Sequence, residues 1–206
     1  ELQAPGLGMA VSIFNIRGEA VIEQTGELVC LQDFPSHPIE FWQDTDRVKL
    51  KAAYYERFEQ VWAHGDYGYM TKWGGLILLG RSDSVLNPGG VRIGTAEIYR
   101  QVELLDVVLD CVAVGVERAG DEHIVLFVHL AEGRVLDDLL TEQISIKIRT
   151  NTTPRHVPAR IVQVPAIPRT RSGKLGEAAV RAIANGKPYD NHAALANPDV
   201  LEYFKL

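Results

Sequence analysis

A change of sequence pattern near residues 80–83 constrains the fold of this chain more than any other feature. Before it, apolar runs are short and are separated by glycine-containing or polar turns, which is typical of β-strands. After it, apolar residues recur at helical spacing in some stretches and run continuously in others. We therefore predict a mainly β region over residues 1–80 and an α+β region over residues 84–206.

Short strands and one helix are expected in the first region. Each predicted strand is an apolar run bounded by turn-forming residues, and the predicted helix lies in a polar and aromatic stretch of mixed charge. The strands are placed at residues 9–14, 26–31, 61–63 and 76–79, and the helix at residues 49–57.

The second region alternates between helical and strand-like periodicity. Ile98, Val102 and Leu105 share one face of a predicted helix whose N-cap is Thr95. In the last helix, Gly176 would cost about 1 kcal/mol of helix propensity relative to Ala. Helices are predicted at residues 95–105, 137–149 and 175–184, and strands at residues 111–116, 123–130 and 160–164, before a tail that wraps the surface and ends in a short helix.

Composition excludes several classes of protein. The formal net charge is −6 and no long basic run occurs, so a nucleic-acid surface is not expected. No stretch approaches the roughly 18 apolar residues of a membrane span, and no His/Cys spacing is typical of a metal site. Cys30 and Cys111 lie in apolar stretches and are interpreted as buried thiols in a reducing compartment. Because the chain begins at Glu1 rather than Met and soon enters a strand, we expect it to be part of a longer protein.

Two of the polar, glycine-containing stretches place charged side chains next to glycine. Asp66 follows Gly65 at the end of a predicted strand, where a carboxylate can accept hydrogen bonds from ribose hydroxyls or form an Asx-turn. Arg81 could bind a phosphate through its planar guanidinium, or pair with Asp83 or Asp66.

The stretch that contains Arg81 runs on to a glycine pair, and a third stretch ends in a lysine. Gly89 and Gly90 permit either a tight turn or close approach of a narrow ligand, before Val91 and Ile93 resume a strand. Residues 168–174 do not form a P-loop, because that motif needs Gly five residues before its Gly-Lys pair and Ser or Thr after the Lys. This chain has Pro168 and Leu175 there, which leaves Lys174 on a Ser-Gly turn as either a catalytic or a merely solvated lysine.

Taken together, these stretches resemble the adenylate-forming superfamily of acyl-CoA synthetases, peptide-synthetase adenylation domains and luciferases. That superfamily has a Gly-Asp element, a Gly-Arg-x-Asp hinge leading through Gly-x-Arg-Ile to an acidic helix, and a Ser-Gly-Lys loop. Residues 65–66, 80–97 and 172–174 follow this order. Residues 87–100, 151–158 and 194–198 are similar to the acetoacetyl-CoA synthetase branch. The alternatives are acetate or propionate synthetases, or a non-catalytic module derived from a synthetase.

The resemblance implies a fold and an activity. Residues 1–80 would end the large adenylation domain, residues 81–83 would form a hinge centred on Asp83, and residues 84–206 would form a small mobile lid domain. The activity would be an AMP-forming acid–CoA ligase that converts acetoacetate, ATP and CoA to acetoacetyl-CoA, AMP and pyrophosphate through an acyl-adenylate. Mg²⁺ would accompany ATP, without a metal site of the chain's own.

Site roles follow from the same resemblance. Lys174 would be catalytic and would stabilise charge around the α-phosphate, while Asp66 would bind the ribose hydroxyls with Arg81 beside the ribose and phosphate. The CoA step would use Gly89 and Gly90 lining the pantetheine tunnel, Arg92 facing the active site, and Lys147 or Arg149 at the CoA phosphate. Ser145 departs from the family pattern here, because some relatives have a basic residue at its position. The phosphate loop and acyl pocket lie upstream in the family, so the isolated chain is predicted to be an inactive part of a cytoplasmic enzyme.

Overall fold

The chain divides into two units, each with its own β-sheet. The computed structural model describes all 206 residues, and their contacts separate Glu1–Asp83 from Ser84–Leu206. The boundary lies at the end of residues 81–83, whose role as a hinge stays a prediction.

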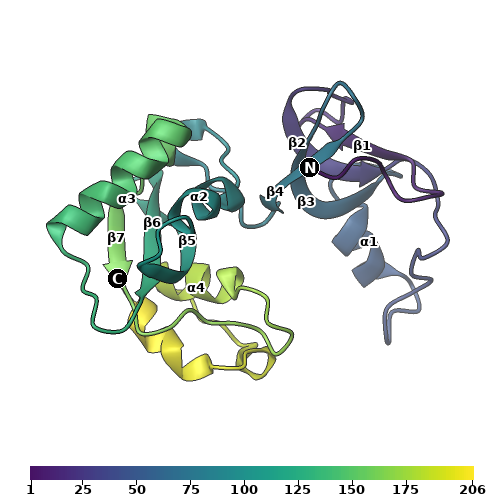
Figure 1. Cartoon of the computed structure of the whole chain (residues 1–206). Coiled ribbons are helices and arrows are strands. Elements are labelled where there is room, and N and C mark those ends of the chain that lie inside the picture. Colours follow the sequence, from purple (N-terminus) through teal and green to yellow (C-terminus); the bar gives the residue numbers. More distant parts are fainter. The chain divides into compact units, whose positions relative to one another are not determined.

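The first unit is a four-stranded antiparallel sheet in the order β1-β2-β3-β4 (Figure 1). All four predicted strands are present, and the predicted helix is α1 (Val48–Tyr54), which packs against β3. The strands are β1 (Val11–Phe14), β2 (Thr25–Cys30), β3 (Trp62–Met70) and β4 (Leu76–Arg81).

Strand β3 is longer than predicted, and this changes the position of Asp66. The prediction ended the strand at residue 63 because His64, Gly65 and Asp66 resemble a turn. In the structure β3 lies between β2 and β4, so its backbone groups pair on both sides and the strand continues to Met70. Asp66 therefore lies within a strand, opposite Arg81 of β4, and the expectation of a strand end was wrong.

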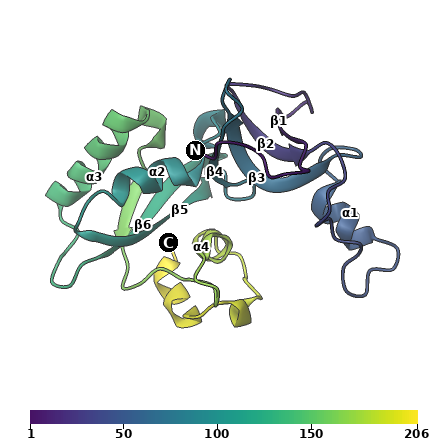
Figure 2. The same ribbon diagram turned by 45° about the vertical axis from the view of Figure 1, so that its right-hand side comes forward.

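The second unit has a three-stranded sheet in the order β5-β6-β7, with helices on both faces (Figures 1 and 2). Strands β5 and β6 are antiparallel, and β7 is parallel to β6. The predicted order of helix, strand, strand, helix, strand, helix is confirmed, as α2 (Thr95–Val102), β5 (Val108–Arg118), β6 (Asp121–Leu130), α3 (Asp138–Asn151), β7 (Arg160–Gln163) and α4 (Glu177–Ala184).

Alternating residues of β5 and β6 bury the two faces of this sheet. One face packs Cys111 and Leu126 against Ile98 of α2 and Ile144 of α3. The other packs its valines and Phe127 against α4 and the C-terminal tail. Burying a large apolar side chain contributes about 1.5–3 kcal/mol, so both helical layers are fixed to the sheet by their apolar faces.

Two helix starts differ from the prediction. Gly94, not Thr95, is the N-cap of α2, because the Glu97 carboxylate accepts a hydrogen bond from Gly94 N at 3.0 Å while the Thr95 hydroxyl donates to Glu177 at 3.0 Å. Helix α4 begins at Glu177, with Gly176 at its N-cap. Gly176 therefore imposes no penalty inside the helix, and it lies close to the Pro168 carbonyl, which accepts its N–H at 2.8 Å.

Short 3₁₀ segments lie before α2, before β7 and after α4. Ile93 forms only an isolated bridge with Leu86, so the strand expected at residues 91–93 is absent. The predicted terminal helix is a 3₁₀ helix that buries Phe204 against Phe127, with ring centroids 4.7 Å apart. These turns are η1 (Pro88–Gly90), η2 (Pro154–His156), η3 (His192–Ala194) and η4 (Pro198–Phe204).

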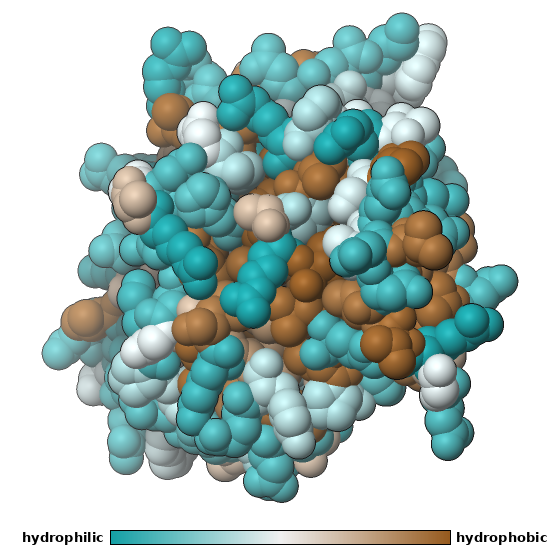
Figure 3. All heavy atoms as spheres, turned by 90° about the vertical axis from the view of Figure 1, so that its left-hand side faces the viewer, coloured by the Kyte–Doolittle hydropathy of each residue, from teal (hydrophilic) through white to brown (hydrophobic).

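Both cysteines lie in the interior, and apolar side chains are also exposed on the surface. Cys30 and Cys111 are both free and buried, as predicted, and burial raises the pKa of each thiol. None of the helices has the length and apolar character needed to cross a bilayer. Figure 3 shows hydrophobic groups gathered between hydrophilic ones on one face. In the second unit, Leu104, Val135 and Leu139 are 64%, 72% and 77% exposed around a hollow of about 600 Å³.

Candidate functional site

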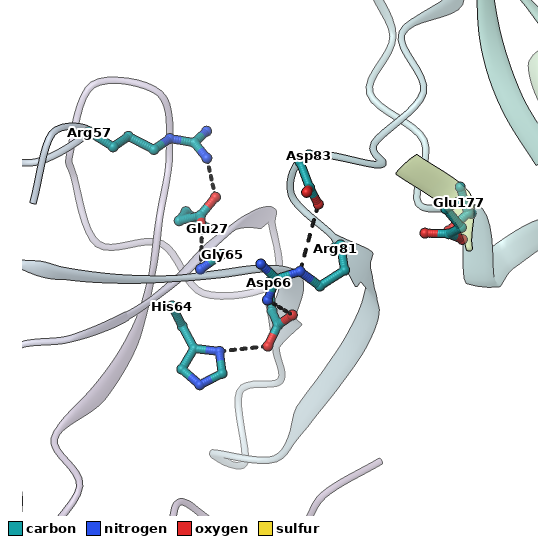
Figure 4. A network of polar contacts seen from close by, with 9 residues as sticks. Glu27, Arg57, His64, Gly65, Asp66, Arg81, Asp83 and Glu177 are labelled. Atoms are coloured by element: carbon teal, nitrogen blue, oxygen red, sulfur yellow. Dashed lines mark hydrogen bonds and ion pairs between the residues drawn. The ribbon is translucent and has the colours of Figure 1, made fainter. Parts of the chain in front are cut away.

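Asp66 and Arg81 form the centre of a polar cluster in the first unit (Figure 4). They face each other across β3 and β4, and Arg81 Nη1 donates to Asp66 Oδ1 at 3.2 Å. The other carboxylate oxygen lies 2.6 Å from His64 Nδ1. Arg81 Nε also lies 3.7 Å from Asp83 Oδ1. Both ion pairs considered for Arg81 are therefore formed, and both oxygens of Asp66 have partners.

These partners keep Asp66 ionised. Burial raises the pKa of Asp66, but the hydrogen bond from His64 and the positive charges of His64 and Arg81 outweigh burial, so the pKa lies below its ordinary value. The hydrogen bond to Asp66 raises the pKa of His64, against the opposing effect of burial. A carboxylate held as an anion at neutral pH can accept hydrogen bonds from two neighbouring hydroxyls.

Glu27 lies beside this cluster and was missed by sequence reasoning. Its side chain is 1% exposed, pairs with Arg57 and accepts the N–H of Gly65 at 3.0 Å. Gly65 has a φ of +82°, and a Cβ there would lie 2.7 Å from Arg81 Nη2. Glu27 thus fixes the glycine that lets Arg81 approach the strand. The only signal in the sequence was a carboxylate inside an otherwise apolar strand.

A hollow of about 410 Å³ opens beside this cluster. Glu27, Arg57, Gly65, Arg81 and Asp83 contribute to its lining. The Asp83 side chain is 70% exposed. The hollow is therefore polar and charged, and it lies at the end of the first unit where β4 leaves the sheet.

Gly89 and Gly90 form a tight turn at the start of the second unit. Both have positive φ values, +55° and +80°, that strongly favour glycine. The Gly89 N–H donates to Asp121 Oδ1 at 3.0 Å, and a Cβ on Gly89 would lie 2.7 Å from Arg155 Nη1. A Cβ on Gly90 would meet no atom within 4 Å. The turn is therefore fixed at Gly89 by its hydrogen bond to Asp121, and it has free space beside the backbone at Gly90.

Two acidic residues at the start of β6, Asp121 and Glu122, hold the Gly89–Gly90 turn, a contact that the sequence did not reveal. Asp121 accepts the N–H groups of Gly89 and Glu122, and these bonds lower the pKa of its carboxyl. Glu122 accepts the N–H of Asn87 at 2.6 Å and pairs with Arg181 at 2.9 Å. Arg92, just beyond the turn, is half-buried.

Lys174 lies on a narrow turn that precedes α4. Thr170 N donates to Lys174 O, and Gly173 N donates to Thr170 O, each at 2.8 Å. Gly173 has a φ of +83° and open space around its Cα. Isolated bridges pair Arg169 with Leu175 and Thr170 with Leu195, so the turn is anchored on both sides. The Lys174 side chain is exposed and makes no ion pair.

The residues considered for the CoA phosphate lie on α3. Lys147 is half-buried, and Arg149 is exposed in the last turn of the helix, while the Ser145 hydroxyl donates to Thr141 O of its own helix at 2.8 Å. No group of three or more His, Cys, Asp or Glu residues is arranged to hold a metal ion. The predicted residues therefore form an Asp66–Arg81–Asp83 cluster, a Gly89–Gly90 turn, the Lys174 turn, and separate positions for Arg92 and Arg149.

Comparison with known proteins decides the family. Residues 102–174 match the family described as AMP-binding enzyme C-terminal domain. The chain is 52% identical over 204 residues to an acetoacetyl-coenzyme A synthetase of Rhizobium meliloti (strain 1021), covering 99% of the chain and 31% of that protein. The chain belongs to the adenylate-forming superfamily.

Further relatives of this superfamily agree. An acetoacetyl-CoA synthetase of Xenopus tropicalis is 43% identical over 207 residues, which is 100% of the chain and 31% of that protein. An acetoacetyl-CoA synthetase structure from Streptomyces lividans superposes with a TM-score of 0.92 at 39% identity, over 100% of the chain and 31% of that protein. The chain thus spans about a third of the length of these adenylate-forming relatives and carries their C-terminal domain.

Proposed function

We propose that the chain is the C-terminal part of an ATP-dependent, AMP-forming acetoacetate–CoA ligase. The observation that carries this proposal is similarity along the whole chain to proteins named acetoacetyl-CoA synthetase, at 52% identity for the relative from Rhizobium meliloti. The three glycine-containing motifs and their local geometry support it. The upstream domain of the same protein would supply the phosphate loop and the acid pocket, so the isolated chain would be inactive.

The first step would join acetoacetate to AMP. One carboxylate oxygen of acetoacetate attacks the α-phosphorus of ATP, the bond to the β,γ-phosphates breaks, and pyrophosphate leaves. Negative charge collects around the α-phosphate, and a cation aimed at that charge lowers the barrier. Lys174 would provide this cation, which its exposed and unpaired ammonium group supports. Mg²⁺ would accompany the ATP phosphates, with no ligand assigned to this chain.

Asp66 and Arg81 would position the nucleotide during this step. The ionised Asp66 would accept hydrogen bonds from the two ribose hydroxyls, in place of or beside its contact with His64. Arg81, which pairs with Asp66 in the structure, would lie next to the ribose and phosphate. A fixed nucleotide allows the attacking carboxylate and the α-phosphorus to meet in a productive arrangement.

The second step would form the thioester. The thiolate of CoA attacks the acyl carbon, and AMP leaves with the bonding electrons of the mixed anhydride. Gly89 and Gly90 would line the path of the pantetheine arm, because Gly90 leaves open space beside the backbone. Arg92 would face the active site, Arg149 or Lys147 would meet the CoA phosphate, and rotation about Asp83 would exchange the two faces of the second unit between the steps.

We further propose a cytoplasmic protein whose substrates are small molecules. Two free, buried thiols fit a reducing compartment. The proposal includes neither a nucleic-acid nor a membrane partner. The partner that the chain requires is the upstream domain, consistent with its span of 31% of the relatives' length.

Acid-dependent exchange of labelled pyrophosphate into ATP would test the function on the intact protein that contains this chain. Acetoacetate, acetate, propionate and butyrate would be compared. We expect the fastest exchange with acetoacetate and a loss of about 100- to 1,000-fold in Lys174→Ala, because one stabilising group of the transition state is removed. Lys187→Ala is the matched control, since Lys187 is also exposed and lies outside the turn.

Other outcomes would correct the proposal in defined ways. Faster exchange with another acid would reject acetoacetate as the substrate and keep the adenylation chemistry. No exchange with any acid, from folded protein, would reject the ligase in favour of a non-catalytic module. Exchange by the isolated 206-residue chain would reject the requirement for an upstream domain.

A further inference from the structure

The guanidinium group of Arg169 connects the tip of the Lys174 turn to the β-sheet. Arg169 Nε and Nη2 donate to Asp110 Oδ2 at 3.0 and 2.7 Å, and Arg169 Nη1 donates to the carbonyl of Gly173 at 2.8 Å. Gly173 directly precedes Lys174. One planar side chain therefore holds the turn at one edge and the sheet at the other.

Asp110 is a fixed point for this contact. It lies on β5 directly after an irregularity in the pairing with β6, between Val108 and Asp110. That irregularity lets Val108 and Cys111 share one core, while Val112 faces the other core. The Asp110 side chain is 19% exposed, and its second oxygen accepts the N–H of Cys111 at 2.9 Å. The carboxylate is thus tied to its own strand.

Apart from Arg169, the turn is held by bonds within itself and by the C-terminal tail, where Ala194 O accepts the N–H of Arg171 at 3.0 Å and Leu195 bridges to Thr170. Ser172 contacts the Thr170 hydroxyl at 3.0 Å, and Gly173 N donates to Thr170 O at 2.8 Å, both inside the same turn. The base of the turn is held differently, since Arg169 N donates to Asn197 Oδ1 at 2.9 Å and Arg169 O accepts the N–H of Ala196 at 2.8 Å. The Arg169 side chain is therefore the link between the tip and the sheet.

Such a link matters because the lysine is long and exposed. A displacement of about 1 Å in a catalytic group can cost about 100-fold in rate. Gly173 has a φ of +83° and a Cβ there would meet no atom within 4 Å, so hydrogen bonds rather than side-chain packing hold the backbone next to Lys174. A hydrogen bond from a planar, charge-paired guanidinium restrains that backbone in one orientation.

We propose that Arg169, oriented by Asp110, is a positioning residue that sets the place of Lys174 for adenylation and has no part in thioester formation. The inference rests on the proposed function, in which Lys174 acts in the first step and the Gly89–Gly90 turn in the second. Arg169 acts through the Gly173 carbonyl and does not contact the substrate.

The test compares the two half-reactions in the intact ligase that contains this chain. Pyrophosphate exchange reports adenylation, and CoA-dependent consumption of supplied acetoacetyl-adenylate reports thioester formation. For Arg169→Ala we expect the exchange kcat to fall by about 10- to 100-fold, with KM for ATP and the thioester rate each changed by less than about twofold. Arg169→Lys should lose most of the same activity, because an ammonium group cannot span Asp110 and Gly173 at once.

A double-mutant cycle tests the role of Asp110. Asp110→Asn should lower exchange less than Arg169→Ala, and the double variant should be no slower than Arg169→Ala alone, since Asp110 acts through Arg169. Arg17→Ala is the matched control, because Arg17 also pairs with a carboxylate, Glu19, but both side chains are exposed, at 75% and 57%. Its two half-reactions should equal those of the unsubstituted protein.

The possible failures can be told apart. Equal losses in both half-reactions, with a lower Tm, would overturn the proposal in favour of a purely structural ion pair. Unchanged exchange in Arg169→Ala and Arg169→Lys would also overturn it. If the unsubstituted ligase shows no exchange, or if Lys174→Ala retains it, the proposed function itself fails.

Discussion

Asp66 in the first unit and Lys174 in the second are prepared for their proposed roles in opposite ways. Asp66 lies within a strand paired on both sides, and both of its oxygens have charged or polar partners. Lys174 lies on a turn, with an exposed ammonium group that makes no ion pair. A carboxylate that binds the nucleotide can remain in a rigid, paired site. A lysine that acts in only one of the two steps lies on a turn, and another residue must then hold it in position.

The largest expected difference lies in the kinetic constants. Asp66→Ala should raise KM for ATP by about 10- to 100-fold, because charge-assisted hydrogen bonds contribute about 1.5–3 kcal/mol to binding. Lys174→Ala should instead act mainly on kcat. Steady-state pyrophosphate exchange over a range of ATP concentrations separates the two. An Asp66 variant with a lower kcat and an unchanged KM would contradict the comparison, since it would show that Asp66 stabilises the transition state.

Substitution of one glycine in each site tests how rigid the two sites are, and we expect an effect of intermediate size. Gly65 and Gly173 have nearly equal φ values, +82° and +83°, so an Ala at either position strains the backbone by about 1 kcal/mol. Only at Gly65 would the new Cβ also meet another side chain, at 2.7 Å from Arg81 Nη2. We expect Gly65→Ala to lower the free energy of unfolding more than Gly173→Ala, as measured by urea denaturation. Equal losses would contradict the close packing of the Asp66 cluster.

The smallest expected effect is a pH dependence at the His64–Asp66 pair. The pKa of His64 is raised above 6.5, so its contribution to stability is present below that value and is lost as pH rises through the folded pKa. The pKa of Asp66 is lowered below 3.8, so its contribution is present above that value and is lost as pH falls through the folded pKa. The pair therefore stabilises the fold most between these two values.

His64→Asn tests that window. Because His64 is partly exposed, solvent screening limits the stabilisation to less than about 1 kcal/mol. The difference in free energy of unfolding between the unsubstituted protein and His64→Asn should be larger at about pH 5.5 than at about pH 8.5. A difference independent of pH would show that His64 contributes by packing and not by charge, and would leave Asp66 paired by Arg81 alone.

Local sequence patterns predicted most of the elements and their order. Helical spacing placed Ile98 and Val102 on one face, and both are buried. Continuous apolar runs identified the two long strands that follow them, β5 and β6. The family resemblance read from the glycine-containing motifs also holds, since the comparisons assign the chain to that family. Such features succeed because periodicity, turn chemistry and short motifs act over a few neighbouring residues.

Only the tertiary structure decided the contacts between residues that are far apart in the chain. Glu27 reaches Gly65 across 38 residues, and Arg169 reaches Asp110 across 59. The Thr95 hydroxyl likewise donates a hydrogen bond to Glu177 instead of capping its own helix. Sequence alone determined the order of the main elements and which motifs they carry, because those depend on local spacing. The partners that hold Asp66 and Lys174 in place depend on which strands and turns become neighbours. The tertiary fold decides those neighbours, since they come from distant parts of the chain.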